Sequence, residues 1–327
     1  MSRSILVLLV SLNRIEAVVI DLDGNSFASN INQDLRVDND LSGANFFRGD
    51  FTGANFSNVI FDGATFQQAE LSGTNFSNAS LVSVNFFRAD LDGAIIASAT
   101  LTNANFQEAD LEMANLSGSD LSGANLFKAD LEDAILTGAD LSGAFLQQAN
   151  FQATDLSGAN LSNTNSFQTN FQDANLDSVD LSNSNLQQAD LAGADLSEAD
   201  LTNTNSFNAN FQNTDLTSAD LSNSNLQQAD LAGANLSGAS LTDTNLFNTD
   251  FSSATLVGAD LSSSNNTDRA IFDETLFDAE TDFSGSNTPD PFAEEGLVFV
   301  PEPLSYPILL SLSALGFTVL RRRQRRK

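Results

Sequence analysis

Large apolar side chains recur at every fifth position from Leu41 to Leu261. Leu or Phe occupies 42 of these 45 positions, and Ile96, Ser166 and Ser206 are the exceptions. A small residue, most often Ala, stands two places before the centre, and Asp or Asn usually stands one place before it. A period of five fits neither the alternation of a strand nor the 3.6-residue turn of a helix. The chain must therefore turn a corner in every unit, and four corners predict a square coil of twenty residues.

A longer repeat supports the twenty-residue coil, because its length of forty residues is two coils. The segment 161–195 recurs in closely similar form as 201–235. Phe follows the centre on alternate coils, and Gln takes the same place on the coils between them. Coils stacked at the strand spacing of about 4.8 Å would form a solenoid, with Phe and Gln on alternate rungs of one face. This regularity disfavours a disordered low-complexity tract.

Tandem units of the form A(D/N)LXX fill residues 41–265, as in "SDLSGANLFKADLEDA". In this pattern the chain resembles the pentapeptide-repeat family. The resemblance implies an all-β fold, a right-handed quadrilateral parallel β-helix with the centre and the small residue facing inward. About eleven coils at the strand spacing would give a rod about 50–55 Å long.

The segments that flank the repeat predict two caps and a linker. Solenoid ends expose apolar core, so we expect residues 18–40 to cover the first coil and residues 266–283 to cover the last. Near "SSSNNTDRA" the frame slips, and it resumes one residue later at Phe272 and Phe277. Residues 284–299 are typical of a flexible acidic linker.

Composition excludes several kinds of chemistry. The chain has no Cys and no His, so disulfides, thiolate nucleophiles and the commonest general base are missing. Between residues 18 and 299, 41 acidic and five basic residues leave a net charge of −36. That charge excludes ordinary binding to the phosphates of nucleic acids. Acidic pairs occur in every coil and mark no cleft, so we predict that the protein is not an enzyme.

Sorting the outward positions by twenties gives columns of like residues. One column holds Asn from Asn45 to Asn265 except at Thr65 and Phe145, and its stacked amides can hydrogen-bond from rung to rung. Acidic columns repel themselves and are candidate binding sites for Ca²⁺, against the simpler alternative of a solvated face with diffuse sodium. The candidates are Asp50, Glu70, Asp90, Asp110 and Asp130 in one column, and Asp180, Asp200 and Asp220 in another.

The basic residues of the regular coils fall forty residues apart on one face. With the rings that precede them they form a candidate interaction stripe of Phe47, Arg48, Phe87, Arg88, Phe127 and Lys128. The simpler interpretation is charge relief, because each basic residue stands two places before an acid, at Asp50, Asp90 or Asp130. Where the centre is Ser166 or Ser206, the next residue, Phe167 or Phe207, could turn inward, and the pattern leaves this open.

The C-terminal segment 300–327 has the features of an export address. It combines a Pro-Glu-Pro motif, an apolar run at 304–320 and the basic ending "RRRQRRK". This combination resembles the PEP-CTERM sorting signal. The resemblance implies that a membrane exosortase recognises the motif and that cleavage then removes the tail; the motif residues are Pro301, Glu302 and Pro303. Until cleavage the apolar run would anchor the chain, with the basic ending in the cytoplasm.

Residues 1–17 are typical of a signal peptide, with a misassigned start or a buried first strand as alternatives. Together the features predict an exported rod at the cell surface or outside the cell, acting as a structural or interaction protein. Extracellular polymers or surface proteins would be its partners. The rival prediction is an acidic mimic of DNA that binds a DNA-binding protein such as gyrase. Neither prediction decides whether the chain forms a homodimer.

Overall fold

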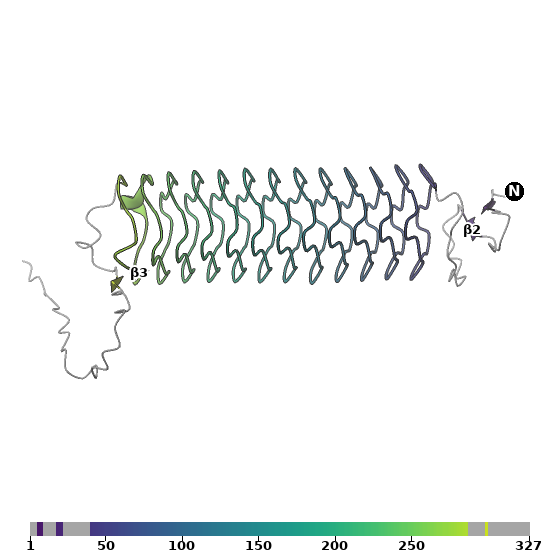
Figure 1. Cartoon of the computed structure of the whole chain (residues 1–327). Helices are drawn as coiled ribbons and strands as arrows, with labels where there is room; N and C mark the ends of the chain where they lie inside the picture. The colour runs from purple at the N-terminus through teal and green to yellow at the C-terminus, as the bar shows by residue number, and fades with distance from the viewer. Residues whose placement is uncertain (1–4, 9–17, 22–39, 287–297, 300–327) are drawn as a thin grey trace, which may run out of the picture.

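The structure is a computed structural model that describes residues 5–8, 18–21, 40–286 and 298–299. Residues 40–286 form a long stack of similar coils, which Figure 1 shows from the side. The short named elements lie outside the regular coils. They are β1 (Ile5–Leu8), β2 (Val18–Asp21), the 3₁₀ helix η1 (Thr267–Arg269), β3 (Leu276–Phe277) and β4 (Val298–Phe299).

Each five-residue unit contains one tight turn that begins at the centre. In the first unit the Ala44 N–H donates to the Leu41 carbonyl at 3.1 Å, and the same bond recurs along the rod. The second residue after the centre has a positive φ, as at Gly53 (68°) and Asn103 (57°). A turn of this kind needs a left-handed residue at its third place, where Gly and Asn are least strained. This requirement explains why Gly, Asn and Ser are common at that position.

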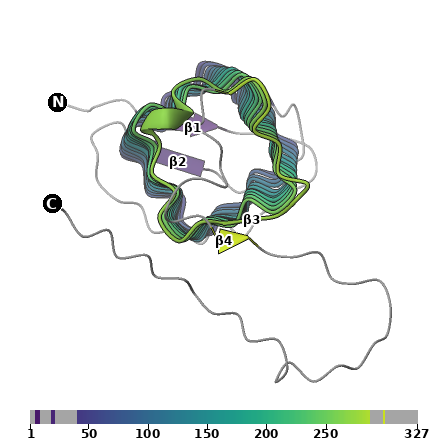
Figure 2. The ribbon, with the colours of Figure 1, turned by 90° about the vertical axis from the view of Figure 1, so that its left-hand side faces the viewer.

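Successive coils are joined by parallel bridges between residues twenty apart. Asn45 bridges Thr65, and each later bridge position repeats this offset as far as Asn245 and Asn265. The bonds run both ways: the Phe46 N–H donates to the Thr65 carbonyl at 2.8 Å, and the Thr65 N–H donates to the Ala44 carbonyl at 2.9 Å. Figure 2 looks along the stack and shows a four-sided outline. The twenty-residue coil predicted from the sequence is confirmed.

The centres and the small residues fill the interior of the coils. The centres from Phe61 to Leu261 have essentially no exposed surface. Near the first coils the rings of Phe46, Phe66, Phe86 and Phe106 stack on successive rungs, with centroids 4.7, 5.3 and 5.1 Å apart. At Thr74, Ser119 and Thr154, which replace the small Ala, the buried hydroxyl donates to a backbone carbonyl of the preceding coil and is therefore satisfied.

The two serine centres keep the regular orientation. Ser166 and Ser206 are fully buried, whereas Phe167 and Phe207 remain partly exposed on the surface. Ser166 Oγ lies 3.1 Å from Thr164 Oγ1, and Thr164 Oγ1 donates to the hydroxyl of Ser184 at 3.1 Å. The alternative left open by the sequence is therefore decided: the serines point inward and the phenylalanines outward.

The last coils contain two insertions, of which the sequence predicted one. After η1 the bridge offset becomes 21, between Asp250 and Ile271, and the new centres Phe272 and Phe277 are buried. A second insertion makes the offset 22 between Asp260 and Asp282. Its turn is organised by the Asp278 carboxylate, which accepts hydrogen bonds from the backbone at 258, 280 and 281 and from the Thr281 hydroxyl.

The described terminal pieces form two small pairings. β1 pairs antiparallel with β2, from Ile5 opposite Asp21 to Leu8 opposite Val18. β4, at the end of the predicted linker, pairs in parallel with β3. The rest of the predicted signal peptide, N-terminal cap and linker, and the whole sorting segment 300–327, lie outside the described residues. Within the described ranges, no helix is long and apolar enough to span a membrane.

Candidate interaction surface

The Asp or Asn before each centre caps the turn that follows it. Asn85 Oδ1 accepts the Phe87 N–H at 3.0 Å, and Asp90 Oδ1 accepts the Asp92 N–H at 3.1 Å. The same contact recurs on all four faces of the rod, for example at Asn55. A short side-chain oxygen placed here satisfies a backbone donor that the turn leaves free. Much of the acidity of the chain therefore has a structural role, which the sequence pattern did not reveal.

The column of Asn residues forms the amide ladder predicted from the sequence. Asn105 Nδ2 donates to Asn85 Oδ1 at 3.0 Å, and Asn125 Nδ2 donates to Asn105 Oδ1 at 3.1 Å. Further bonds join 165 to 185, 205 to 225 and 225 to 245. Most of these amides, such as Asn85, Asn105 and Asn125, also accept a turn N–H from their own coil, so the column links adjacent coils through side chains as well as backbone. We call this set, from Asn45 to Asn265, the amide column.

The structure brings the candidate acidic residues together as predicted. Asp50, Glu70, Asp90, Asp110 and Asp130 follow one another through parallel bridges, and so do Asp180, Asp200 and Asp220. Burial and the neighbouring carboxylates, chiefly Asp90 and Asp130, raise the pKa of Asp110. Farther along, Asn150 Nδ2 donates to Asp130 Oδ1 at 2.9 Å. In the part of the chain that the structure describes, no three acidic, His or Cys side chains form a group that could hold a metal ion.

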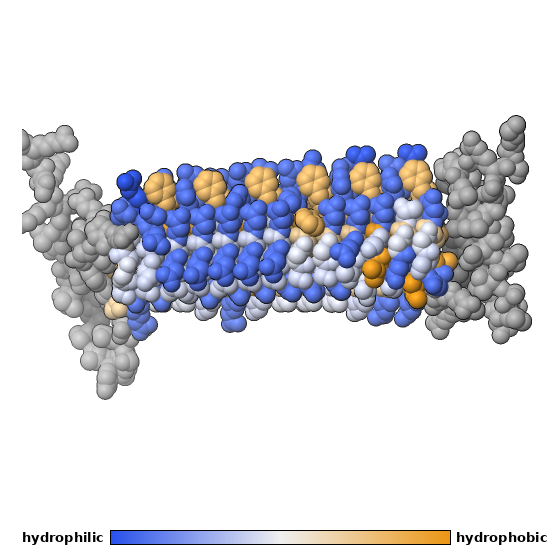
Figure 3. Space-filling view, turned by 90° about the horizontal axis from the view of Figure 1, so that it is seen from above, coloured by the Kyte–Doolittle hydropathy of each residue, from blue (hydrophilic) through white to orange (hydrophobic). Residues whose placement is uncertain are grey.

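A row of partly exposed rings runs along one edge of the rod. Figure 3 shows these apolar groups at even intervals beside polar columns. They belong to the aromatic column, which alternates Phe and Gln from Phe47 to Phe247. Backbone bonds hold its rungs in place: the Gln68 N–H donates to the Phe87 carbonyl at 2.9 Å, and the Arg88 N–H donates to the Gln107 carbonyl at 3.0 Å. The spacing of the rings is thus set by the ladder itself.

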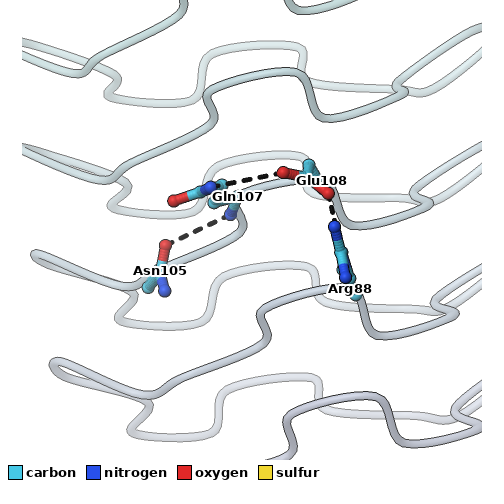
Figure 4. Close-up of polar contacts among 4 residues, drawn as sticks. All are labelled: Arg88, Asn105, Gln107 and Glu108. Atoms are coloured by element: carbon cyan, nitrogen blue, oxygen red, sulfur yellow. Dashed lines mark hydrogen bonds and ion pairs between the residues drawn. The ribbon is translucent and has the colours of Figure 1, made fainter.

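Two of the basic residues beside these rings, Arg48 and Arg88, contact the next rung, and the acidic partner of Arg88 is not the one that the charge-relief interpretation named. Arg88 Nε lies 2.7 Å from Glu108 Oε2, and Arg48 Nε donates to Gln68 Oε1 at 2.8 Å. Figure 4 shows Arg88 reaching toward Glu108, which also accepts from Gln107 Nε2 at 3.3 Å. These two hydrogen bonds, that from Arg88 first, lower the pKa of Glu108.

The same basic groups cover the rings that precede them. The Arg48 guanidinium lies 5.0 Å from the centroid of Phe47, and that of Arg88 lies 4.9 Å from Phe87. The Lys128 ammonium lies 5.3 Å from Phe127. These are cation–π distances, worth about 0.5–1 kcal/mol at an exposed site. The six residues of the predicted interaction stripe therefore form three ring–cation pairs on alternate rungs of one edge.

The centre of this edge is hollowed. An open hollow of about 520 Å³ is lined by Phe127, Phe145 and Phe167 together with Asn125 and neighbouring glutamines. Phe145 interrupts the amide column. Its side chain is 51% exposed, compared with 41% for Phe47. The hollow and Phe145 are the part of the edge that sequence reasoning missed, although the break in the amide column was visible.

Comparison with known proteins agrees with the repeat geometry. Residues 39–116 match the family described as pentapeptide repeat region, and residues 124–163, 169–205, 207–231 and 224–262 match pentapeptide repeats. The chain belongs to the pentapeptide repeat family. Pentapeptide repeat proteins fold as right-handed quadrilateral β-helices, so the predicted fold class is confirmed, while the count of about eleven coils stays a prediction. They are generally structural or interaction proteins and not enzymes.

Solved pentapeptide repeat structures include several relatives. HetL, involved in heterocyst differentiation regulation in the cyanobacterium Nostoc sp. strain PCC 7120, is 31% identical; the match covers 72% of this chain and 90% of HetL, with a TM-score of 0.22. QnrB1, a plasmid-mediated fluoroquinolone resistance protein, is 20% identical, covers 59% of this chain and 93% of its own, and has a TM-score of 0.38. A search of curated protein sequences found no match.

Proposed function

We propose that this pentapeptide repeat protein is an exported, non-enzymatic rod that works at the cell surface or in the extracellular matrix. The observation that carries the proposal is the filled interior of the coils, which leaves long columns of repeated side chains as the working surface. Such columns suit a structural or interaction role along an extended partner, such as a matrix polymer or a surface protein. The sequence features at residues 1–17 and at Pro301-Glu302-Pro303 support export through an exosortase.

Two epitope tags in the native host test the address. One tag is placed in the predicted linker at 284–296 and the other after Lys327. We expect the linker tag to be accessible on intact cells and the terminal tag to be lost after processing. An untagged strain and a strain with Pro301-Glu302-Pro303 changed to alanine serve as controls. Recovery of both tags in the cytosol would overturn the export proposal.

The acidic columns would, on this proposal, collect cations along their length. The support is the run of carboxylates on successive rungs. Burial is the larger cause of the raised pKa of Asp110, and repulsion from the neighbouring carboxylates adds to it. A cation that binds the folded rod and not the unfolded chain would raise its melting temperature. Thermal melts with and without Ca²⁺, at matched ionic strength, measure this. An unchanged melting temperature would leave a solvated face with diffuse sodium.

A second candidate function is mimicry of DNA toward a DNA-binding protein such as gyrase. The observation that favours it is the row of Asp180, Asp200 and Asp220 on a rod of strongly negative charge. A supercoiling assay with the purified chain and gyrase measures this directly. Inhibition that disappears in a variant with these three residues changed to Asn would support mimicry. The absence of any effect at micromolar protein would remove this candidate and leave the export proposal untouched.

A further inference from the structure

One edge of the rod is nearly free of acidic residues. We define the aromatic edge as three neighbouring columns: the amide column, the aromatic column, and the column at 48–248 that follows it. Within the regular coils 41–265, Glu108 is the single acid on this edge, and it is paired with Arg88. The three basic residues of those coils lie on the same edge, and all their other Asp and Glu residues lie elsewhere. Two chains of net charge −30 therefore repel least when they approach along it.

We propose that two copies of this chain pack side by side, in antiparallel orientation, along the aromatic edge. The rungs of two copies have the same spacing, so five of the six rings on one copy can face the five glutamines of the other without accumulated mismatch. A different extended partner would need a matching repeat of about 10 Å, two rungs of about 4.8 Å. A second copy of this chain has the same repeat because its coils are identical.

Charge favours the antiparallel arrangement over the parallel one. Within the regular coils the basic residues Arg48, Arg88 and Lys128 all lie in the first half, and the same column carries Gln and Asn in the second half. Beyond those coils the Arg269 guanidinium lies 5.9 Å from the ring of Phe247 and 3.8 Å from the Asp268 carboxylate. Parallel packing would set the three cations of one copy against those of the other. Antiparallel packing places Arg88 and Lys128 against the neutral half. In the register in which five of the six rings face a glutamine, Arg48 lies opposite the paired Asp268 and Arg269 of the partner subunit, whose charges offset each other.

The hollow lies at the middle of this arrangement. In the same register the two-fold axis passes between the rungs of Gln147 and Phe167, both of which line the hollow. The two copies of Phe145 then lie one rung apart, and each can enter the hollow of the other copy. A central aromatic group in a pocket is the usual site of the strongest contribution to an interface. Closed two-fold pairing uses the same patch twice, as this edge requires.

The edge is large enough for a small interface that dissociates on dilution. It is about 53 Å long for rungs spaced about 4.8 Å apart. Each rung crosses the edge in the tight turn that begins at the centre, whose ends lie within about 7 Å, plus one residue of about 3.3 Å, so the strip is about 10 Å wide. It would bury about 530 Å² on each copy, just above the roughly 1,000 Å² in total that a specific interface needs.

Sedimentation velocity of the full chain over a range of concentrations tests the proposal. We expect a dimer that dissociates on dilution. Phe145→Asp should raise the dissociation constant at least about 30-fold, the effect of losing a strong interface residue. Ile135→Asp is the matched control, because Ile135 is similarly exposed at 43% but lies on a different column. A wild-type chain that stays monomeric throughout, or equal loss of dimer in both variants, would overturn the proposal.

Cross-linking tests the orientation and register. The chain has no cysteine, so each single substitution gives one defined attachment point for a short bismaleimide. Gln148→Cys lies beside the proposed two-fold axis and should cross-link to its own copy in the partner. Asn248→Cys lies near one end, about nine rungs or roughly 43 Å from its copy in an antiparallel pair, and should not. Equal cross-linking at both sites would indicate parallel packing and contradict the proposal.

Discussion

Replacing Asp110 by Asn tests whether the acidic column works against the stability of the rod. Asp110 is the backbone bridge partner of Asp90 on one adjacent coil and of Asp130 on the other. Burial together with these carboxylates raises the pKa of Asp110. The variant would keep a side-chain oxygen for the Glu112 N–H, which lies 3.1 Å from Asp110 Oδ1. It would also offer an amide to Asp90, as Asn150 already does to Asp130 at 2.9 Å. We therefore expect Asp110→Asn to stabilise the folded chain.

The expected gain follows from the ladder spacing. Two unit charges about 5 Å apart repel by about 0.8 kcal/mol in water, and Asp110 has one such neighbour above and one below. Solvent and salt weaken the repulsion at this partly exposed site, so the two repulsions together amount to roughly 1 kcal/mol. The stabilisation should therefore be about 1 kcal/mol at neutral pH and low salt, and it should shrink strongly in about 1 M NaCl.

The pH dependence has a definite sign. A carboxyl whose pKa is higher in the folded state holds its proton more tightly there, so ionisation favours unfolding. Below pH 3.8, the ordinary pKa, Asp110 is protonated in both states and costs no stability. As the pH rises from 3.8 through the raised folded pKa, ionisation of Asp110 lowers the free energy of unfolding. The advantage of Asp110→Asn should appear over this interval and should decline when both proteins are compared in acid.

Denaturant unfolding followed by circular dichroism measures these effects, and Asp120→Asn is the control. Burial raises the pKa of Asp120, but hydrogen bonds from Ser122 and Thr102 outweigh it and lower the pKa. The Ser122 and Thr102 hydroxyls lie 2.6 and 2.9 Å from its oxygens. Asp120→Asn should therefore be neutral or destabilising. A less stable Asp110→Asn variant, or a gain that persists undiminished at high salt, would refute the repulsion argument.

Three further substitutions test the coil itself through their unfolding midpoints. Phe86→Ala should destabilise by about 3–5 kcal/mol, because the ring stacks on both neighbouring rungs; a loss below 1 kcal/mol would contradict tight packing. Ala153→Gly should stabilise by about 1 kcal/mol, because Ala153 has a φ of 53°; lower stability would count against strain in the turns. Thr154→Val should cost about 1 kcal/mol by removing the 2.8 Å bond to the Leu131 carbonyl, and an unchanged midpoint would show that bond to be dispensable.

The core register could be predicted from the sequence because a period of five admits few structures. A chain that buries one large and one small residue in every five must turn at each unit, and the forty-residue repeat equals two coils of twenty, so it keeps like residues in the same column. The same reasoning placed Phe272 and Phe277 in the core after the first insertion. It did not predict the second insertion, because that turn depends on several bonds to the Asp278 carboxylate and not on an apolar period.

The surface was predicted less well, because neighbours along the chain are not neighbours in space. Charge relief was assigned between Arg88 and Asp90, two residues apart. In the structure Arg88 lies in a turn and Asp90 lies in a bridge, so the two residues belong to different columns. The ion-pair partner of Arg88 is Glu108, twenty residues on, which occupies the same column on the next rung. Turn capping by Asp and Asn was missed for a related reason: the same residue types also suit an amide ladder or a charged face, and only geometry separates these roles.

The register of twenty also determines how the rod would respond to tension. Each coil is bonded to the coil before it and the coil after it, and to no more distant part of the stack in the bridge ladder of residues 40–282. A pull on the two ends should therefore detach terminal coils one at a time, while the middle stays intact. Each event would release twenty residues, up to about 66 Å of extended chain. A rod that lengthens in equal steps would absorb load gradually, as a tether does, where a single globular core would give way at once.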